Sequence, residues 1–68
     1  MTRDTRIALF LMGELVAALR ANDLDAFRGS LSEGIQELGL TEVEELLDWL
    51  YPFLTPEEQD RLTGWHLG

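Results

Sequence analysis

Apolar residues occupy nearly every position from 7 to 19, and they fall on all sides of the helix that this segment predicts. We expect that helix from about residue 3 to residue 21. Thr2 or Asp4 is its expected N-terminal cap, because either side chain accepts a hydrogen bond from a free backbone N–H. Three faces of the helix are apolar, and they consist of Ala8, Leu11, Leu15 and Leu19, of Leu9, Met12 and Val16, and of Phe10, Gly13 and Ala17.

A helix that is apolar all round is expected to be buried all round. Three short helices from the same chain are too few to cover it, so the pattern predicts a homodimer in which two copies of this helix pack together. Gly13 and Ala17, four residues apart, are small enough to allow a close approach of the two backbones. The dimer interface predicted in this way comprises Leu9, Phe10, Met12, Gly13, Val16 and Ala17.

A second helix is predicted from a regular apolar pattern that begins after residue 22 and ends at Gly39. Asn22 is the expected cap, with Asp25 at the third helical position. Gly39 is the expected end, because glycine commonly follows the last residue of a helix. The buried side chains are expected at spacings of three and four residues, at Leu24, Phe27, Leu31, Ile35 and Leu38.

Two shorter helices are predicted downstream, each from a capping box. Thr41 with Glu44 opens one helix, and Thr55 with Glu58 opens the next, which has Pro56 at its first position. Pro52 ends or kinks the former helix. Its buried stripe is expected at Val43, Leu46, Leu47 and Leu50, and the last helix is expected to stop at Gly64, followed by the tail Trp65, His66, Leu67 and Gly68, mobile unless it docks.

These elements predict an all-α fold with a single domain over residues 1–68. It consists of a helical hairpin of two longer helices plus two short helices, which together form a dimeric helical bundle. A chain of 68 residues with no cysteine has only a small core and no disulfide, whereas 46% of its residues are hydrophobic. Dimerisation explains this excess. The apolar run near the N-terminus is shorter than the ~20 residues of a membrane span, so we expect a cytoplasmic protein without membrane contact.

The formal net charge of −8 argues against nucleic acid as a ligand, because binding phosphates requires clustered basic residues. The charge is also uneven along the chain. Residues 1–30 have a net charge of zero, because they contain as many acids as arginines, whereas residues 31–68 contain nine acids and a single arginine, Arg61. This distribution favours assembly through the first half and electrostatic recognition through the second.

The residues needed for catalysis or metal binding are mostly missing from the sequence. Cysteine and lysine are absent, and the only histidine, His66, lies near the C-terminus, so we expect no enzyme and no cofactor. The segment that starts with Asp23 and Asp25 resembles the beginning of a calcium-binding loop. However, the glycine and glutamate expected further along such a loop are replaced by Arg28 and Gly34, which argues against a metal site.

The third predicted helix carries an acidic surface beside aromatic residues. Trp49 lies at the edge of the buried stripe, and exposed aromatic residues beside charges are typical anchors of protein interfaces. We therefore predict that a basic partner binds to Glu44, Glu45, Asp48, Trp49 and Tyr51. Two alternatives stay open. The acids form a solvated face whose first-turn residues, Glu42, Glu44 and Glu45, favour the helix dipole, or Trp49 belongs to a dimer core or covers the bend at Pro52.

In its small size, acidity, lack of lysine, helical pattern and apolar first helix, the chain resembles the phage-encoded anti-activators that block bacterial quorum-sensing transcription factors. The resemblance covers the whole chain but involves no short motif, so it transfers no functional residue. It implies a homodimer that occupies the DNA-binding domain of a LuxR-type activator, and a second host target such as the pilus-assembly ATPase. The alternatives are an anti-CRISPR or antitoxin-like inhibitor, or a structural dimerisation module whose acidity serves solubility.

Overall fold

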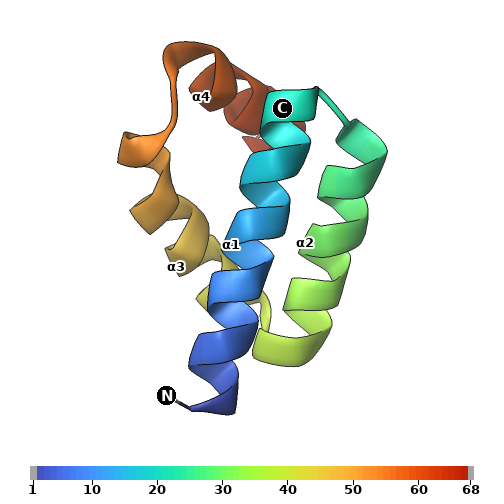
Figure 1. Ribbon diagram of the computed structural model, residues 1–68, viewed down its shortest axis with the longest axis vertical. Coiled ribbons are helices and arrows are strands. Elements are labelled where there is room, and N and C mark those ends of the chain that lie inside the picture. The colour runs from blue at the N-terminus through green and yellow to red at the C-terminus, as the bar shows by residue number, and fades with distance from the viewer. Residues whose placement is uncertain (1, 68) are drawn as a thin grey trace.

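The computed structural model describes residues 2–67, and within this range the chain is all-helical. Two longer and two shorter α-helices are present among these residues, as the sequence predicts, joined or followed by two short helical segments (Figure 1). In chain order they are α1 (Arg3–Ala21), α2 (Leu24–Leu38), α3 (Leu40–Leu50), the 3₁₀ turn η1 (Tyr51–Phe53), α4 (Pro56–Leu62) and the π-helical turn η2 (Thr63–Leu67). In the part of the chain that is described, no helix is both long enough and apolar enough to cross a membrane.

The α1 and α2 helices form the predicted antiparallel hairpin, side by side along the longest axis of the molecule (Figure 1). The α3 helix is inclined to α1 and packs across it, and α4 returns to the C-terminal end of α1 (Figure 1). The α3 and α4 helices therefore lie on the side of α1 that α2 leaves open.

Thr2 caps α1 by accepting a hydrogen bond from the Thr5 N–H, so one of its two predicted caps is confirmed.

The junction between α1 and α2 differs from the prediction in its cap. Asn22 ends α1 in the left-handed conformation, with a φ of 55°, and Asp23 caps α2 by accepting from the Ala26 N–H. Asparagine tolerates this conformation better than most residues, so the chain reverses at Asn22 and the carboxylate that follows is free to act as the cap. The predicted cap at Asn22 is wrong by one residue.

The predicted capping box of Thr41 and Glu44 is also wrong. Gly39 ends α2 as expected, with its N–H donating to the Ile35 carbonyl, but it is at the same time the N-cap of α3. Its φ of 93° is favoured by glycine and makes the turn sharp enough for a single residue to join the two helices. Thr41 consequently lies inside the first turn of α3, where no side chain caps the helix.

The second predicted box is present, since Thr55 accepts from the Glu58 N–H while the Glu58 carboxylate accepts from the Thr55 N–H. The end of α4 differs from the prediction, because helical backbone continues through Gly64 as η2. The predicted tail is docked at Trp65. The Trp65 ring packs on Phe27 with 5.3 Å between ring centroids, while Gly68 lies outside the described residues.

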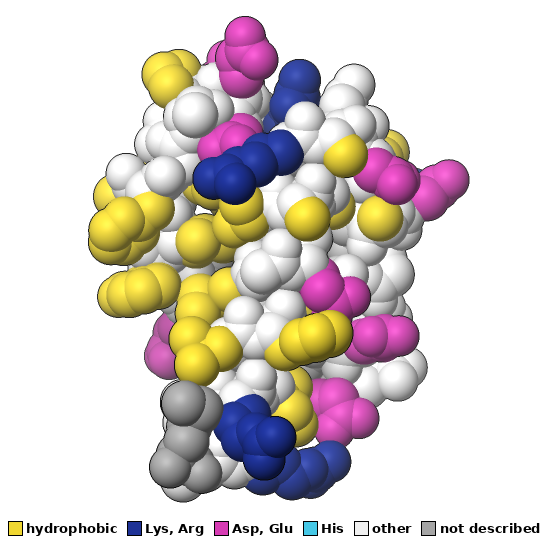
Figure 2. Space-filling view, in the orientation of Figure 1, with side chains coloured by type: hydrophobic (Ala, Val, Ile, Leu, Met, Phe, Trp, Pro, Cys, Tyr) yellow, Lys and Arg dark blue, Asp and Glu magenta, His cyan; other side chains and the backbone are white. Residues whose placement is uncertain are grey.

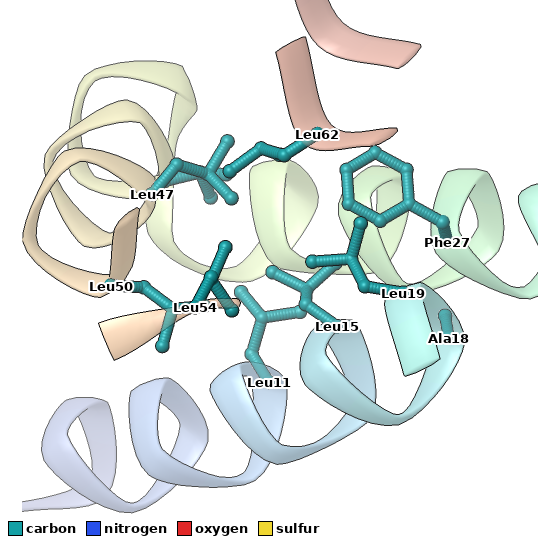
Figure 3. Packing of buried hydrophobic residues seen from close by; sticks show 10 residues of the cluster. Leu11, Leu15, Ala18, Leu19, Phe27, Leu47, Leu50, Leu54 and Leu62 are labelled. Atoms are coloured by element: carbon teal, nitrogen blue, oxygen red, sulfur yellow. The ribbon is translucent and has the colours of Figure 1, made fainter. Parts of the chain in front are cut away.

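The core lies where the four α-helices meet. Figure 3 shows its side chains pointing toward one another from α1, α2, α3, α4 and the segment after η1. Phe27, Leu15, Leu19 and Val43 are the largest fully buried side chains. The remaining buried apolar residues are Leu11, Ala18, Leu47, Leu50, Leu54 and Leu62. The predicted stripe of α3 is confirmed except at Leu46, which is half-buried and packed against the cluster. On α2 only Phe27 of the five predicted positions is buried, while Leu31, Ile35 and Leu38 are half-buried against the cluster and Leu24 is half-buried.

Polar contacts attach α4 to the end of α1. Arg61 donates a 2.7 Å hydrogen bond to the Leu19 carbonyl, which lies in the last turn of α1 and also accepts from the Asn22 N–H at 3.3 Å. Arg20 forms an ion pair with the buried Glu58 carboxylate at 3.1 Å. The hydrogen bond from the Thr55 N–H and the nearby Arg20 guanidinium lower the pKa of Glu58, against the opposing effect of burial. These contacts fix α4 against the end of α1, and a 2.9 Å hydrogen bond from the Gln59 side chain to the Tyr51 carbonyl joins α4 to η1.

Candidate protein-binding surface

The outer face of α3 carries the predicted acids and aromatic residues in exposed positions. Glu42, Glu44, Glu45 and Asp48 are all exposed, and none of the ion pairs found within residues 2–67 involves an acid of α3. The Trp49 side chain is 60% exposed, so in this protomer it is not a core residue. The outer face of α3 therefore exposes carboxylates that form no ion pair with any cation of residues 2–67, together with the large apolar side chain of Trp49.

The structure divides the five predicted partner-binding residues between two sides of α3. Glu45 and Trp49 face a groove between α1 and α3. Glu44, Asp48 and Tyr51 line a shallower depression on the other side, next to residues of α4 and η2 that include His66. Successive residues of an α-helix are about 100° apart, so five residues within an eight-residue segment cannot share one narrow face. A partner with a flat binding surface would contact only some of these five residues, unless it extended across α3 to both of its sides.

The groove between α1 and α3 has a volume of about 640 Å³. Its apolar lining comes from Ala8, Leu9, Met12, Leu38, Leu46 and Trp49. Its charged lining is entirely acidic and consists of Asp4, Glu37, Glu42 and Glu45. Figure 2 shows that hydrophobic side chains gather on the left of α1, toward α3 and η1, whereas acidic side chains lie over α2 on the right.

The residues predicted for a dimer interface also separate. Leu9 and Met12 lie in the α1–α3 groove beside Trp49. Phe10, which is 72% exposed, lines a different groove between α1 and α2. Of the rest, Gly13 and Ala17 are exposed, with no atom within 4 Å of the position of a Gly13 Cβ, and Val16 is half-buried against the core. The apolar surface of α1 thus contributes to both of its flanks and to its outer face.

Sequence reasoning missed one prominent part of this surface. The Phe53 side chain in η1 is 71% exposed, and its ring pairs with Trp49 at 5.3 Å between centroids. Leu40, at the start of α3, is also exposed. The spacing of four between Trp49 and Phe53 was the available signal, but Pro52 made a continuous helical register across this segment look improbable. The exposed aromatic surface is therefore an aromatic pair rather than a lone tryptophan.

Within the described residues, no three His, Asp or Glu side chains are placed to hold a metal ion. Comparisons of the chain with protein-family models, with curated proteins and with solved structures found no match.

Proposed function

We propose that this chain is a non-catalytic protein-binding inhibitor that occupies a basic surface of another protein. The observation that carries the proposal is the exposed surface of α3, where carboxylates without ion pairs among residues 2–67 lie on both sides of the helix and Glu42 and Glu45 share a groove with Trp49, which pairs with the exposed Phe53. The carboxylates complement cations on the partner and speed association, whereas the aromatic pair provides affinity by burying apolar area. An isolated acidic face would lack the second component.

The partner that we propose is the DNA-binding domain of a transcriptional activator in a bacterial host. Such a domain exposes the lysines and arginines that hold DNA phosphates, and the carboxylates of α3 would occupy the place of those phosphates. The resemblance to phage anti-activators agrees with this choice and extends it to a LuxR-type regulator. Binding would block DNA by steric and electrostatic exclusion, without any contact between this acidic chain and DNA.

The inhibitor is proposed to act as a homodimer, formed through the outer face of α1. That face presents Gly13 and Ala17, with Phe10 at its edge toward the α1–α2 groove, and the charged residues at its two ends are Arg6 and Arg20. It combines an exposed aromatic side chain with small residues that permit close backbone contact. This face is separate from the outer face of α3, so a dimer would present two copies of the partner-binding surface.

Binding kinetics with a purified LuxR-type DNA-binding domain test the proposal. The parent chain should bind the domain and release it from operator DNA. The double variant Glu45→Arg with Asp48→Arg should associate about tenfold more slowly at low salt and show a weaker salt dependence. The control, Glu33→Arg with Asp60→Arg, changes the net charge equally at exposed positions outside α3 and should have a smaller effect.

Two results would contradict the proposed function. If the two double variants slow association equally, then only net charge matters and α3 is not the contact. If the parent chain leaves the domain bound to DNA, then the activator is not the target. A chain that dimerises but binds no such domain would instead be a structural dimerisation module.

A further inference from the structure

The α1–α3 groove has the composition of a helix-binding site. Its floor is apolar, and Leu9, Met12 and Trp49 expose side chains to it from two different helices. The part of α1 that lines it runs from residue 4 to residue 12, which corresponds to about two helical turns, or ~12 Å. An amphipathic helix commonly binds such a groove through apolar residues at positions i, i+3 or i+4, and i+7.

The charges at the groove define which kind of helix fits it. Asp4, Glu42 and Glu45 line the groove from both sides, and none of them has an ion-pair partner among residues 2–67. The remaining acid, Glu37, pairs with Arg3 at 3.2 Å, in a contact that is exposed on both sides and hence weak. An apolar floor between carboxylates is complementary to an apolar helix face between cations.

We infer that the α1–α3 groove receives an amphipathic helix of the partner protein, whose apolar face is flanked by lysine or arginine. The inference rests on the proposed function and specifies how the basic partner is recognised. The partner's apolar residues insert beside Leu9, Met12 and Trp49, while its cations meet Glu42 and Glu45. In this arrangement the groove selects for both features together, because a helix with only one of them leaves either apolar surface or carboxylates unmatched.

The charge also argues against a second copy of this chain as the occupant. Each copy carries a net charge of −8, and the groove itself is lined by acids on both sides. A second copy bound there would bring its own excess of carboxylates toward them, which is unfavourable. Of the two arginines at the ends of the outer face of α1, Arg20 is already paired with the Glu58 carboxylate of its own chain at 3.1 Å, so it is not free to offset this repulsion.

A synthetic helical peptide of about four turns provides the test. Its leucines occupy one face, its lysines flank that face on both sides, and its Kd for the full chain is measured by calorimetry. One control peptide has the same composition with the leucines scrambled around the helix, and a second has glutamate in place of lysine. We expect the designed peptide to bind at least about tenfold more tightly than either control, with an affinity that falls as salt is added.

Matched variants locate the binding site. Leu9→Arg introduces a cation and a bulky side chain into the groove, whereas Phe10→Arg makes the same change at the next residue, on the other side of α1. Leu9→Arg should weaken peptide binding at least about tenfold, and Phe10→Arg should leave it unchanged. Equal effects of the two variants, or equal binding of the designed and scrambled peptides, would overturn the inference. Loss of self-association in Leu9→Arg but not in Phe10→Arg would overturn it too, because the occupant would then be a second copy.

The outcome separates this inference from the proposed function. If the activator domain binds the parent chain and Leu9→Arg equally well, but Glu44→Gln with Asp48→Asn weakens binding, then the basic partner uses the opposite side of α3. The groove inference would then fail while the proposed function stands. If the designed peptide binds in the groove but no activator domain binds the chain, the groove inference stands and the choice of partner is wrong.

Discussion

Two glycines of α2 allow the packing of the α1–α2 hairpin to be tested with the same substitution at two positions. A Cβ at Gly34 would overlap Leu11 Cδ2 and lie 3.1 Å from its Cδ1, and Leu11 is only 3% exposed. A Cβ at Gly29 would meet no atom within 4 Å. Both glycines are inside α2, so the helical backbone is affected alike by either change. Alanine at the two positions therefore differs only in what its methyl group contacts.

The expected changes in the free energy of unfolding have opposite signs for the two substitutions. Replacing a helical glycine with alanine stabilises by about 1 kcal/mol when the methyl group has room. Gly29→Ala should therefore raise the free energy of unfolding by about 0.5–1 kcal/mol. At Gly34 the same gain is opposed by forcing Leu11 aside within a packed core, which costs about 1–3 kcal/mol. Gly34→Ala should thus lower the free energy of unfolding by up to about 2 kcal/mol.

Urea and thermal unfolding followed by circular dichroism measure both effects, at equal protein concentration because dimerisation would shift the midpoint. A change of 1 kcal/mol corresponds to about 4–8 °C in Tm for a domain of this size. In a Leu11→Ala background the obstructing methyl groups are absent, so Gly34→Ala should become stabilising. If Gly34→Ala stabilises the parent chain as much as Gly29→Ala does, then α1 and α2 are not in close contact at this point and the packing described here is wrong.

Three further predictions concern other parts of the molecule. The pKa of Glu58 is lowered in the folded state, so its carboxylate stabilises the fold fully above its ordinary pKa of 4.5, and this stabilisation is lost as pH falls through the lowered value. In acid, the free energy of unfolding should therefore depend less on pH in Glu58→Gln than in the parent chain. An unchanged pH profile would contradict this. Trp65→Ala should lower the free energy of unfolding by about 3 kcal/mol in urea titrations, because Trp65 packs against the core. Trp49→Ala should lower it by less than about 0.5 kcal/mol, because Trp49 is mostly exposed. Equal losses would place Trp49 in a core. Gly13→Leu should weaken the proposed dimer by about 1–3 kcal/mol, which light scattering would detect, and a parent chain with a mass of 7.7 kDa at micromolar concentration would show that no dimer forms.

The helices were predictable from the sequence because an apolar run, an apolar period or a capping box marks each of them. The expected range of α1 agrees with the observed Arg3–Ala21, since a nearly continuous apolar run is bounded by polar residues on both sides. The errors concern the ends of the helices, including the last one, which continues through Gly64. Asn22 and Asp23 are both good capping residues, and their roles depend on which of them adopts the left-handed conformation, a property of the whole turn. Gly39 serves two helices at once, which a pattern read one helix at a time does not reveal.

The candidate surface was predictable only in part. Exposure of the α3 acids and of Trp49 followed from the position of the buried stripe along that helix. Their distribution between a groove and a separate depression depends on how α1 and α4 approach α3, which involves residues distant in sequence. The docking of Trp65 on Phe27 depends in the same way on the return of α4 to α1. Periodicity gives the faces of a helix but not the neighbours of each face.

The acids of α3 are not explained by the stability of the fold. With α3 beginning at Leu40, only Glu42 lies in the first turn, so the dipole benefit expected for Glu44 and Glu45 does not apply. Asp48 lies near the C-terminal end, where the dipole disfavours a negative charge, and like charges four residues apart, as in Glu44 and Asp48, destabilise a helix by about 0.2–0.5 kcal/mol.

The exposed aromatic pair leads to the same conclusion from packing. Trp49 and Phe53 contact each other and leave most of their surface outside the core, so burial within the protomer accounts for little of their apolar area. The outer face of α3 thus combines charges that weaken the helix with aromatic rings that the core does not need. Neither feature is required by the fold of a single chain, whereas both are what a basic, partly apolar partner surface would require.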